Sequence, residues 1–366
     1  MNAFLRRHKK LHIWLAVDLE VLLVFLLVRE RRDWMNALAE RVTGPLKKAV
    51  GQLCYRTEFS VMEALLILAA LAAAVWLAAS AAALVRSRHK AHTLYSALLA
   101  LACAGLTVYL GFCWLWGVNY YTDSFQDKSG VYAREVSVEE LYRVTDYFAG
   151  RLAETADMVA RNGDGVFAES RESIMENSTG AYTQVSERFP FLSFDDRPPK
   201  AVYFSRIMSR MNFTGVYCPY TGESNVNVDS PACLLPSTIA HELAHQRGVA
   251  SEQECNFLAV LASTTCGDPV YEYSGWLLGY IHLSNALYRA DKELYRQIRD
   301  RLPEGALADM RTNDAYWARF RDGAVSQTSQ KIYDSFLKGY GETRGIRSYG
   351  TVVDLLVVWY DADPAA

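Results

Sequence analysis

The segment from residue 64 to residue 85 constrains the fold more than any other part of the chain. It reads ALLILAALAAAVWLAASAAALV and contains no charged side chain. About 20 apolar residues in a helix are enough to cross the hydrocarbon core of a bilayer. The high alanine content also suits close packing between helices in lipid. The sequence therefore predicts a transmembrane helix over residues 64–85.

Two further apolar segments have the length of a membrane span. Residues 94–116 end in a cluster of tryptophans followed by tyrosines, which are enriched where a span meets the headgroup region. Residues 11–28 are also long enough, although Asp18 and Glu20 would each cost about 3 kcal/mol near the bilayer centre. A contact between helices or an off-centre span explains these acids more simply than an intramembrane polar site. No small-residue cleavage site follows the apolar run, which favours a span over a signal peptide.

The sequence thus predicts a membrane region over residues 1–117 with three transmembrane helices. Lys and Arg number seven in the N-terminal segment plus the 86–92 loop, and seven in the 29–58 loop. The positive-inside rule is therefore tied. Because the first set lies in two short segments, we expect a multi-pass protein of the cell membrane with residues 118–366 on the extracytoplasmic side. The lipid bilayer is then one partner of the chain.

The composition excludes two classes of protein. The chain is 51% hydrophobic and 22% charged with a net charge of −3, which describes neither a nucleic-acid binder nor a disordered protein. Residues 118–366 are long enough for one domain. A capping box at Ser137 and Glu140 predicts a helix, and the alternating segment GESNVNVDSP at 222–231 predicts a strand. We expect a mainly α fold with a small β-sheet.

The chemistry of the chain is concentrated in LPSTIAHELAHQRGVASEQECNFLAVLA, residues 235–262. It contains His-Glu-x-x-His, and residues four apart lie on one face of an α-helix. The imidazoles of His241 and His245 can therefore converge on one metal ion. Glu242 lies about 100° round the helix, where a carboxylate can hold and deprotonate a metal-bound water. This is the minimal set of residues for a zinc hydrolase.

The flanking residues predict a helix that stops soon after the motif. Pro236 suits a first turn because its missing N–H would be unpaired there, and Ser237 or Thr238 can cap the helix. Gly248 is placed to end it. The following SEQECNFLAVLA reads as a second helix, which would bring Glu252 back toward the two histidines.

A third ligand is expected from this second helix. Glu252 and Glu254 are the candidates, and only one of them can bind because helical positions two apart point to different sides. We prefer Glu252. Three protein ligands plus water is the open coordination of catalytic zinc, so Zn²⁺ is the expected cofactor, although such a site would also accept other first-row ions. The alternative is a helix whose two histidines and glutamate match the motif by chance.

The motif also resembles that of a known family. HELAHQRG followed by ExECNF resembles the bacterial membrane-protein family called domain of unknown function 3810, regarded as membrane-anchored zinc metallopeptidases. The resemblance extends through residues 215–231 and 333–350. It implies a zincin-like α+β metallopeptidase domain over residues 118–366.

A more distant similarity concerns the third ligand. The sequence Glu252-Gln-Glu-Cys255-Asn256 is similar to the ExxAD or ExxCD element of membrane-embedded gluzincins, in which the first Glu binds zinc. This similarity again favours Glu252. The chain departs from the element by carrying Asn256 where those enzymes carry Asp.

The expected function is that of a membrane-anchored, gluzincin-like zinc metallopeptidase that hydrolyses peptide bonds through a zinc-activated water. His241, His245 and Glu252 would bind Zn²⁺, and Glu242 would be the catalytic base. The substrate would be a peptide or protein, and no nucleic acid is involved. In the segment RGIRSYG, Tyr349 or Arg347 is a candidate donor to the negative charge of the tetrahedral intermediate, with a surface loop residue as the simpler interpretation.

Two other functions are compatible with the same motif. A catalytically inactive membrane protein with a scaffold or signalling role would close the zinc site with a fourth protein ligand, for which Glu254 or Cys255 is the candidate. A hydrolase of envelope material would use the same metal-water chemistry on a different substrate.

Three secondary expectations concern the surroundings of the motif. The strand at 222–231 is either a sheet edge that pairs with substrate or an ordinary half-buried strand. His282 has no partner at ligand spacing, which favours a core or surface histidine. Cys218 and Cys233 flank the segment before the motif and would be able to pair in an oxidising exterior.

Overall fold

The computed structural model describes residues 6–340 and 350–362, and the chain divides into two compact units. Unit 1 comprises Met1–Thr122 with Pro219–Gly222, and unit 2 comprises Asp123–Cys218 with Glu223–Ala366. Most of the described residues are helical, and a small three-stranded sheet lies in unit 2. The prediction of a mainly α fold with a small sheet is confirmed.

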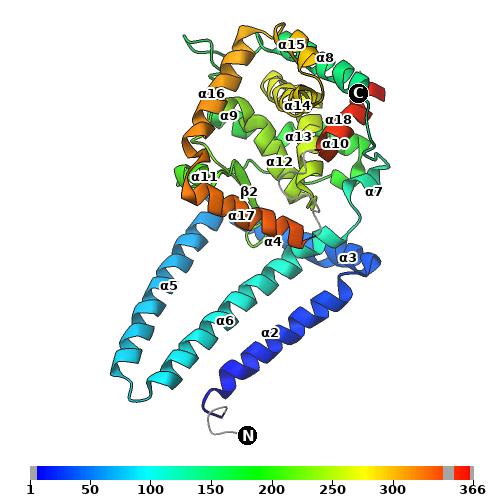
Figure 1. The fold of residues 1–366 in the computed structure, drawn as a ribbon. Helices are drawn as coiled ribbons and strands as arrows, with labels where there is room; N and C mark the ends of the chain where they lie inside the picture. The colour runs from blue at the N-terminus through cyan, green and yellow to red at the C-terminus, as the bar shows by residue number, and fades with distance from the viewer. Residues whose placement is uncertain (1–5, 341–349, 363–366) are drawn as a thin grey trace. The chain divides into compact units, whose positions relative to one another are not determined.

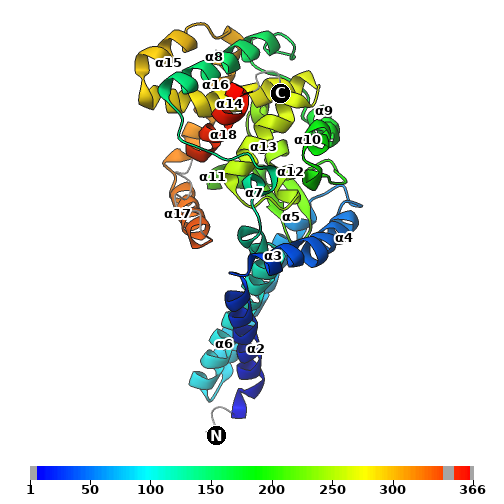
Figure 2. The same ribbon diagram turned by 90° about the vertical axis from the view of Figure 1, so that its right-hand side faces the viewer.

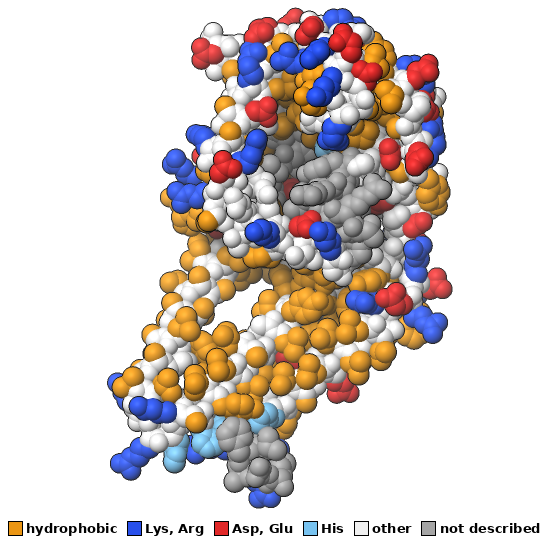
Figure 3. All heavy atoms as spheres, in the orientation of Figure 1, with side chains coloured by type: hydrophobic (Ala, Val, Ile, Leu, Met, Phe, Trp, Pro, Cys, Tyr) orange, Lys and Arg blue, Asp and Glu red, His pale blue; other side chains and the backbone are white. Residues whose placement is uncertain are grey.

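Unit 1 contains three helices that are long and apolar enough to cross a membrane: α2 (Lys9–Val28), α5 (Val61–Arg86) and α6 (Lys90–Leu115). They coincide with the three segments predicted as spans, and each helix begins a few residues earlier than expected. Hydrophobic side chains dominate their exposed faces (Figure 3). Between the first two spans lie α3 (Arg32–Leu38), a short π-helix (Ala39–Thr43) and α4 (Gly44–Cys54).

The two acidic residues of α2 have different environments. Asp18 is buried, and its carboxylate accepts a hydrogen bond from the hydroxyl of Thr107 on α6 at 2.9 Å. The same hydroxyl accepts from the indole N–H of Trp14, also at 2.9 Å. A contact between helices therefore accounts for Asp18. Glu20 is exposed on α2.

Unit 2 contains the remaining α-helices and the sheet (Figures 1 and 2). Its α-helices, in chain order, are α7 (Phe125–Ser129), α8 (Val138–Thr155), α9 (Arg171–Glu176), α10 (Thr183–Arg188), α11 (Ser205–Met211), α12 (Leu235–Gln246), α13 (Glu252–Thr265), α14 (Pro269–Ala290), α15 (Lys292–Arg299), α16 (Glu304–Arg321), α17 (Ala324–Gly339) and α18 (Gly350–Ala362). The predicted capping box is confirmed, since Ser137 and Glu140 cap α8 reciprocally.

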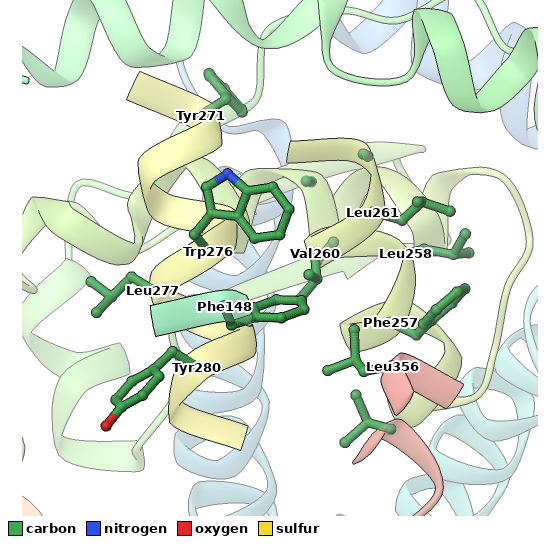
Figure 4. Close-up of a cluster of buried hydrophobic side chains, with 14 of the residues drawn as sticks. Phe148, Phe257, Leu258, Val260, Leu261, Tyr271, Trp276, Leu277, Tyr280 and Leu356 are labelled. Carbon is green, nitrogen blue, oxygen red and sulfur yellow. The ribbon is translucent and has the colours of Figure 1, made fainter. Parts of the chain in front are cut away.

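Helices α12 and α13 are supported by a large aromatic core. Helix α13 packs on α14 and α18, and α14 packs on α8. The ring of Phe148 on α8 lies 4.9 Å from that of Trp276 and 4.8 Å from that of Tyr360, both edge to face. Figure 4 shows Phe148 beneath Trp276 and beside Val260 of α13. This packing fixes α13, which carries several residues of the candidate site.

The three strands are arranged in the order β1-β3-β2, with β1 at Lys200–Ala201, β2 at Gly215–Cys218 and β3 at Glu223–Val226. Strand β3 is parallel to β1 and antiparallel to β2. The expected strand at 222–231 thus exists in shorter form. It is fully buried at the centre of the sheet, so the prediction that it forms an edge is wrong, and β2 is an edge strand.

Candidate metal centre

The His-Glu-x-x-His motif lies on α12, as its spacing predicted. Gly248 follows the helix with φ of +89°, a left-handed conformation that favours glycine, and so ends it. The start differs from the prediction, because the residue before the helix is Leu234 and no side chain caps it. The hydroxyl of Ser237 instead donates to the carbonyl of Leu234 at 3.1 Å.

Three side chains, two from the motif on α12 and one from α13, bring their ligand atoms close together. Nε2 of His241 lies 3.2 Å from Nε2 of His245 and 3.2 Å from Oε2 of Glu252. Oε1 of Glu252 lies 3.5 Å from Nε2 of His245. Tetrahedral zinc with bonds of 2.0–2.1 Å places neighbouring ligand atoms about 3.3–3.4 Å apart. These three side chains therefore fit a zinc ion both in chemistry and in spacing.

The other nitrogen of each imidazole faces a hydrogen-bond acceptor. Nδ1 of His241 lies 3.0 Å from Oδ1 of Asn256, and Nδ1 of His245 lies 2.8 Å from the carbonyl oxygen of Val249. An acceptor at Nδ1 keeps the proton there and leaves the lone pair of Nε2 for a metal. Asn256 thus retains an oxygen acceptor where the gluzincin element has Asp, and sequence reasoning did not identify this role or that of Val249.

Cys255 offers a second set of ligand atoms. One atom each from His241, His245 and Cys255 lie within 4.8 Å of one another, which makes these residues a possible metal-binding cluster. The thiol, however, lies 3.3 Å from Nδ1 of His245, on the opposite side of the ring from Glu252. Burial raises the pKa of Cys255 to about 12, so the thiolate that a metal requires is disfavoured. We therefore favour Glu252 as the third ligand.

Glu254 is turned away from the histidines. Its carboxylate accepts hydrogen bonds from the backbone N–H groups of Phe125 at 2.9 Å and Gln126 at 3.2 Å, and from the side-chain amide of Gln126 at 3.2 Å. The two acidic candidates of α13 thus have different surroundings. Glu252 faces the motif, and Glu254 anchors α7.

The carboxylate of Glu242, a residue of α12, lies against the edge strand β2. Glu242 is 4% exposed, and the backbone N–H of Tyr217 donates to its carboxylate. A Cβ atom added to Gly215 would lie 2.5 Å from Oε1 of Glu242, so the bare backbone of β2 makes room for the carboxylate. Among the described residues, Oε2 of Glu242 has no hydrogen-bond partner. Burial raises the pKa of Glu242, although His241 and His245 lower it, and a carboxyl with a raised pKa suits proton transfer near neutral pH.

Tyr333 is a residue of the site that the sequence did not reveal. Its hydroxyl on α17 donates to Oε1 of Glu252, across a separation of 81 positions in the chain. Burial alone would raise the pKa of Glu252, but His245 and His241 lower it well below its usual value. The carboxylate form that a metal requires is therefore favoured. The candidate donors Tyr349 and Arg347 lie outside the described residues.

Three other residues lie outside the ligand set. His282 is on α14, and burial, with a smaller effect of His241, lowers its pKa to about 4. It does not belong to the possible metal-binding cluster found among the described residues. Cys218 and Cys233 are free thiols, so the structure shows no disulfide between them.

Comparison with known proteins places the chain in a family. The family described as protein of unknown function DUF3810 matches residues 42–357, which include unit 2 up to α18 and much of the membrane region. A search of curated proteins and a search of solved structures each gave no match. Because the match covers most of its length, the chain belongs to the DUF3810 family.

Proposed function

We propose that this protein is a membrane-anchored zinc metallopeptidase with a zincin-like catalytic domain in unit 2, on the extracytoplasmic side. One observation carries the proposal. Nε2 of His241, Nε2 of His245 and the carboxylate of Glu252 lie within 3.2–3.5 Å of one another, beside the buried carboxylate of Glu242. Two imidazoles and one carboxylate form the open ligand set of catalytic zinc.

The residues of the proposed site would have separate roles in the reaction. Zn²⁺ held by His241, His245 and Glu252 would supply a Lewis acid that polarises water and the scissile carbonyl. Glu242 takes the proton from the attacking water and delivers it to the leaving amine. The hydrogen bonding of the Glu242 carboxylate supports this role. The backbone N–H of Tyr217 donates to the carboxylate, whereas Oε2 has no partner among the described residues and can accept a proton.

The side of β2 that faces away from β3 is our candidate for substrate pairing. Within the described sheet, β2 pairs with β3 alone, and Gly215 and Tyr217 of β2 both approach Glu242. A peptide that added to β2 as a further strand would gain main-chain hydrogen bonds without requiring one particular sequence. Its scissile bond would then run beside the general base, which favours a peptide or protein substrate.

The position of Cys255 bears on the alternative of an inactive scaffold protein. A structural zinc site is closed by four protein ligands, and Cys255 is the thiol near the histidines. A closed site would require this thiol, whereas the proposed site uses Glu252. The variant Cys255→Ala separates them, because it should retain zinc in the proposed site and lose zinc from a closed one.

Zinc analysis and cleavage of a peptide library by the full-length protein test the proposal. We expect stoichiometric zinc in both the wild type and Glu242→Gln, with cleavage reduced roughly 10²- to 10⁴-fold in the variant. Equal cleavage by both proteins would exclude Glu242 as the base. Absence of bound zinc from the wild type would exclude the whole mechanism.

A further inference from the structure

We propose that Tyr333 is a positioning residue that ties helix α17 to the metal centre, so that zinc binding and the docking of α17 support each other. The inference rests on the proposed function in one respect, which is that Glu252 is a metal ligand. Two features of the structure support it: the hydrogen bond of Tyr333 and the weak packing of the helix that carries it.

The hydrogen bond fixes the orientation of the ligand carboxylate. Tyr333 donates to Oε1 of Glu252, while Oε2 of the same carboxylate lies 3.2 Å from Nε2 of His241. Oε1 also lies 3.5 Å from Nε2 of His245, so the hydroxyl restrains a carboxylate that faces both imidazoles. Partners of this kind hold a ligand in its binding orientation, and their loss weakens metal affinity. Glu252 is the first residue of α13, so this bond acts where the helix begins.

Helix α17 has little other packing to hold it in place. Of its sixteen residues only Ser326 and Leu337 are buried, and Ile332 is 66% exposed. Figure 2 shows α17 at the side of unit 2, next to α11. Most of the stability of a helix in a protein comes from a buried apolar face, and α17 buries a small one.

The side chain of Tyr333 also connects α17 to the segment that precedes β2. Its ring meets that of Phe213 at right angles, with 5.5 Å between the centroids. Phe213 lies two residues before Gly215, the first residue of β2. From its position on α17, Tyr333 thus contacts both the segment before the edge strand β2 and the ligand carboxylate of Glu252.

A two-way effect follows from these contacts. If the hydroxyl favours the metal-binding orientation of Glu252, zinc must favour the docked position of α17 by the same factor, because coupling between two equilibria is reciprocal. Zinc-loaded protein should therefore hold α17 more firmly than protein stripped of zinc.

Zinc affinity is the first measurement. The full-length wild type, Tyr333→Phe and Tyr288→Phe are titrated with zinc in competition with a chromogenic chelator. Tyr333→Phe keeps the ring that packs on Phe213 and removes only the hydroxyl, so we expect affinity to fall roughly 10- to 100-fold. Tyr288 is 47% exposed and packs on Tyr295, so its variant controls for loss of a tyrosine hydroxyl and should match the wild type.

Hydrogen exchange of residues 324–339 is the second measurement. Zinc should slow exchange in this segment of the wild type and should do so much less in Tyr333→Phe. If the wild type binds no zinc, the proposed function fails together with this inference. If the wild type binds zinc but the affinity of Tyr333→Phe is unchanged, the inference alone is overturned. Should Tyr333→Phe fold poorly, a lack of zinc-dependent protection of α17 in the zinc-binding wild type would overturn the inference instead.

Discussion

Nδ1 of His241 lies 3.0 Å from Oδ1 of Asn256, and Asn256 follows Glu252 by four residues on α13. One helix thus carries both a candidate ligand and the acceptor that orients another ligand. The acceptor is neutral, which distinguishes it from the carboxylate of the gluzincin element. A neutral oxygen still selects the tautomer of His241 and orients its ring.

Replacing Asn256 should change zinc affinity in a predictable order. Asn256→Leu removes the acceptor and should weaken zinc binding roughly 10- to 100-fold. Asn256→Asp keeps an oxygen in place and adds charge, so it should bind zinc at least as tightly as the wild type. The zinc affinities of the wild type and of both variants are measured by competition with a chelator. Unchanged affinity in Asn256→Leu would show that the hydrogen bond does not orient His241.

The two acidic residues of α13 should give opposite phenotypes. Glu252→Gln should lose zinc binding, because its carboxylate faces the histidines, while its stability in the absence of zinc should stay close to that of the zinc-free wild type. Glu254→Ala should bind zinc normally but unfold more easily, since the buried N–H of Phe125 loses its acceptor. The cost of one such unpaired donor is about 1–3 kcal/mol. Zinc titration and thermal unfolding distinguish the two, and the reverse pattern would exchange their roles.

Gly215→Ala tests the contact between β2 and Glu242. The added Cβ would lie 2.5 Å from Oε1 of Glu242, so the carboxylate must move. A displacement of about 1 Å can cost roughly 10²-fold in rate, and we expect a peptidase loss of that order with zinc content unchanged. Gly150→Ala is the control, because its Cβ would meet no atom within 4 Å. Full activity in Gly215→Ala would show that the contact between β2 and Glu242 does not matter for catalysis.

The stability of α8 should depend on pH through Glu140. The hydrogen bond from Arg134, followed by those from Ser137, lowers the pKa of Glu140 from 4.5 to about 2. Because the folded pKa is lowered, the stabilisation is complete above about pH 4.5 and is lost as the pH falls toward 2. The difference in Tm between the wild type and Glu140→Gln should therefore shrink over this range. A difference that stays constant with pH would show that the ionised cap contributes nothing.

Local spacing predicted much of the candidate centre. The four-residue interval between His241 and His245 places both rings on one helix face, and the break at Gly248 returns Glu252 to them. Both features depend on residues close together in the chain. Helix geometry indicated that only one of Glu252 and Glu254 can bind, and the similarity to the gluzincin element favoured Glu252. The contacts of Glu254 with α7 agree with that preference.

Features that depend on distant parts of the chain were missed or misjudged. The alternation at 222–231 predicted a strand, but whether a strand lies at the centre or the edge of a sheet depends on its neighbours, here β1 and β2. Tyr333 reaches Glu252 only because α17 packs beside α11. No periodicity in the sequence contains that information.

The anchoring of α7 by Glu254 limits how far the protein can be shortened. Unit 2 begins at Asp123, and the next residues include the donors Phe125 and Gln126 that satisfy a buried carboxylate on α13. A soluble fragment that starts after residue 129 would keep the whole metal motif, but the buried carboxylate of Glu254 would lose its hydrogen-bond donors. Work on the isolated domain therefore has to retain the few residues from Asp123 through α7, although the candidate metal motif lies more than a hundred residues further along the chain.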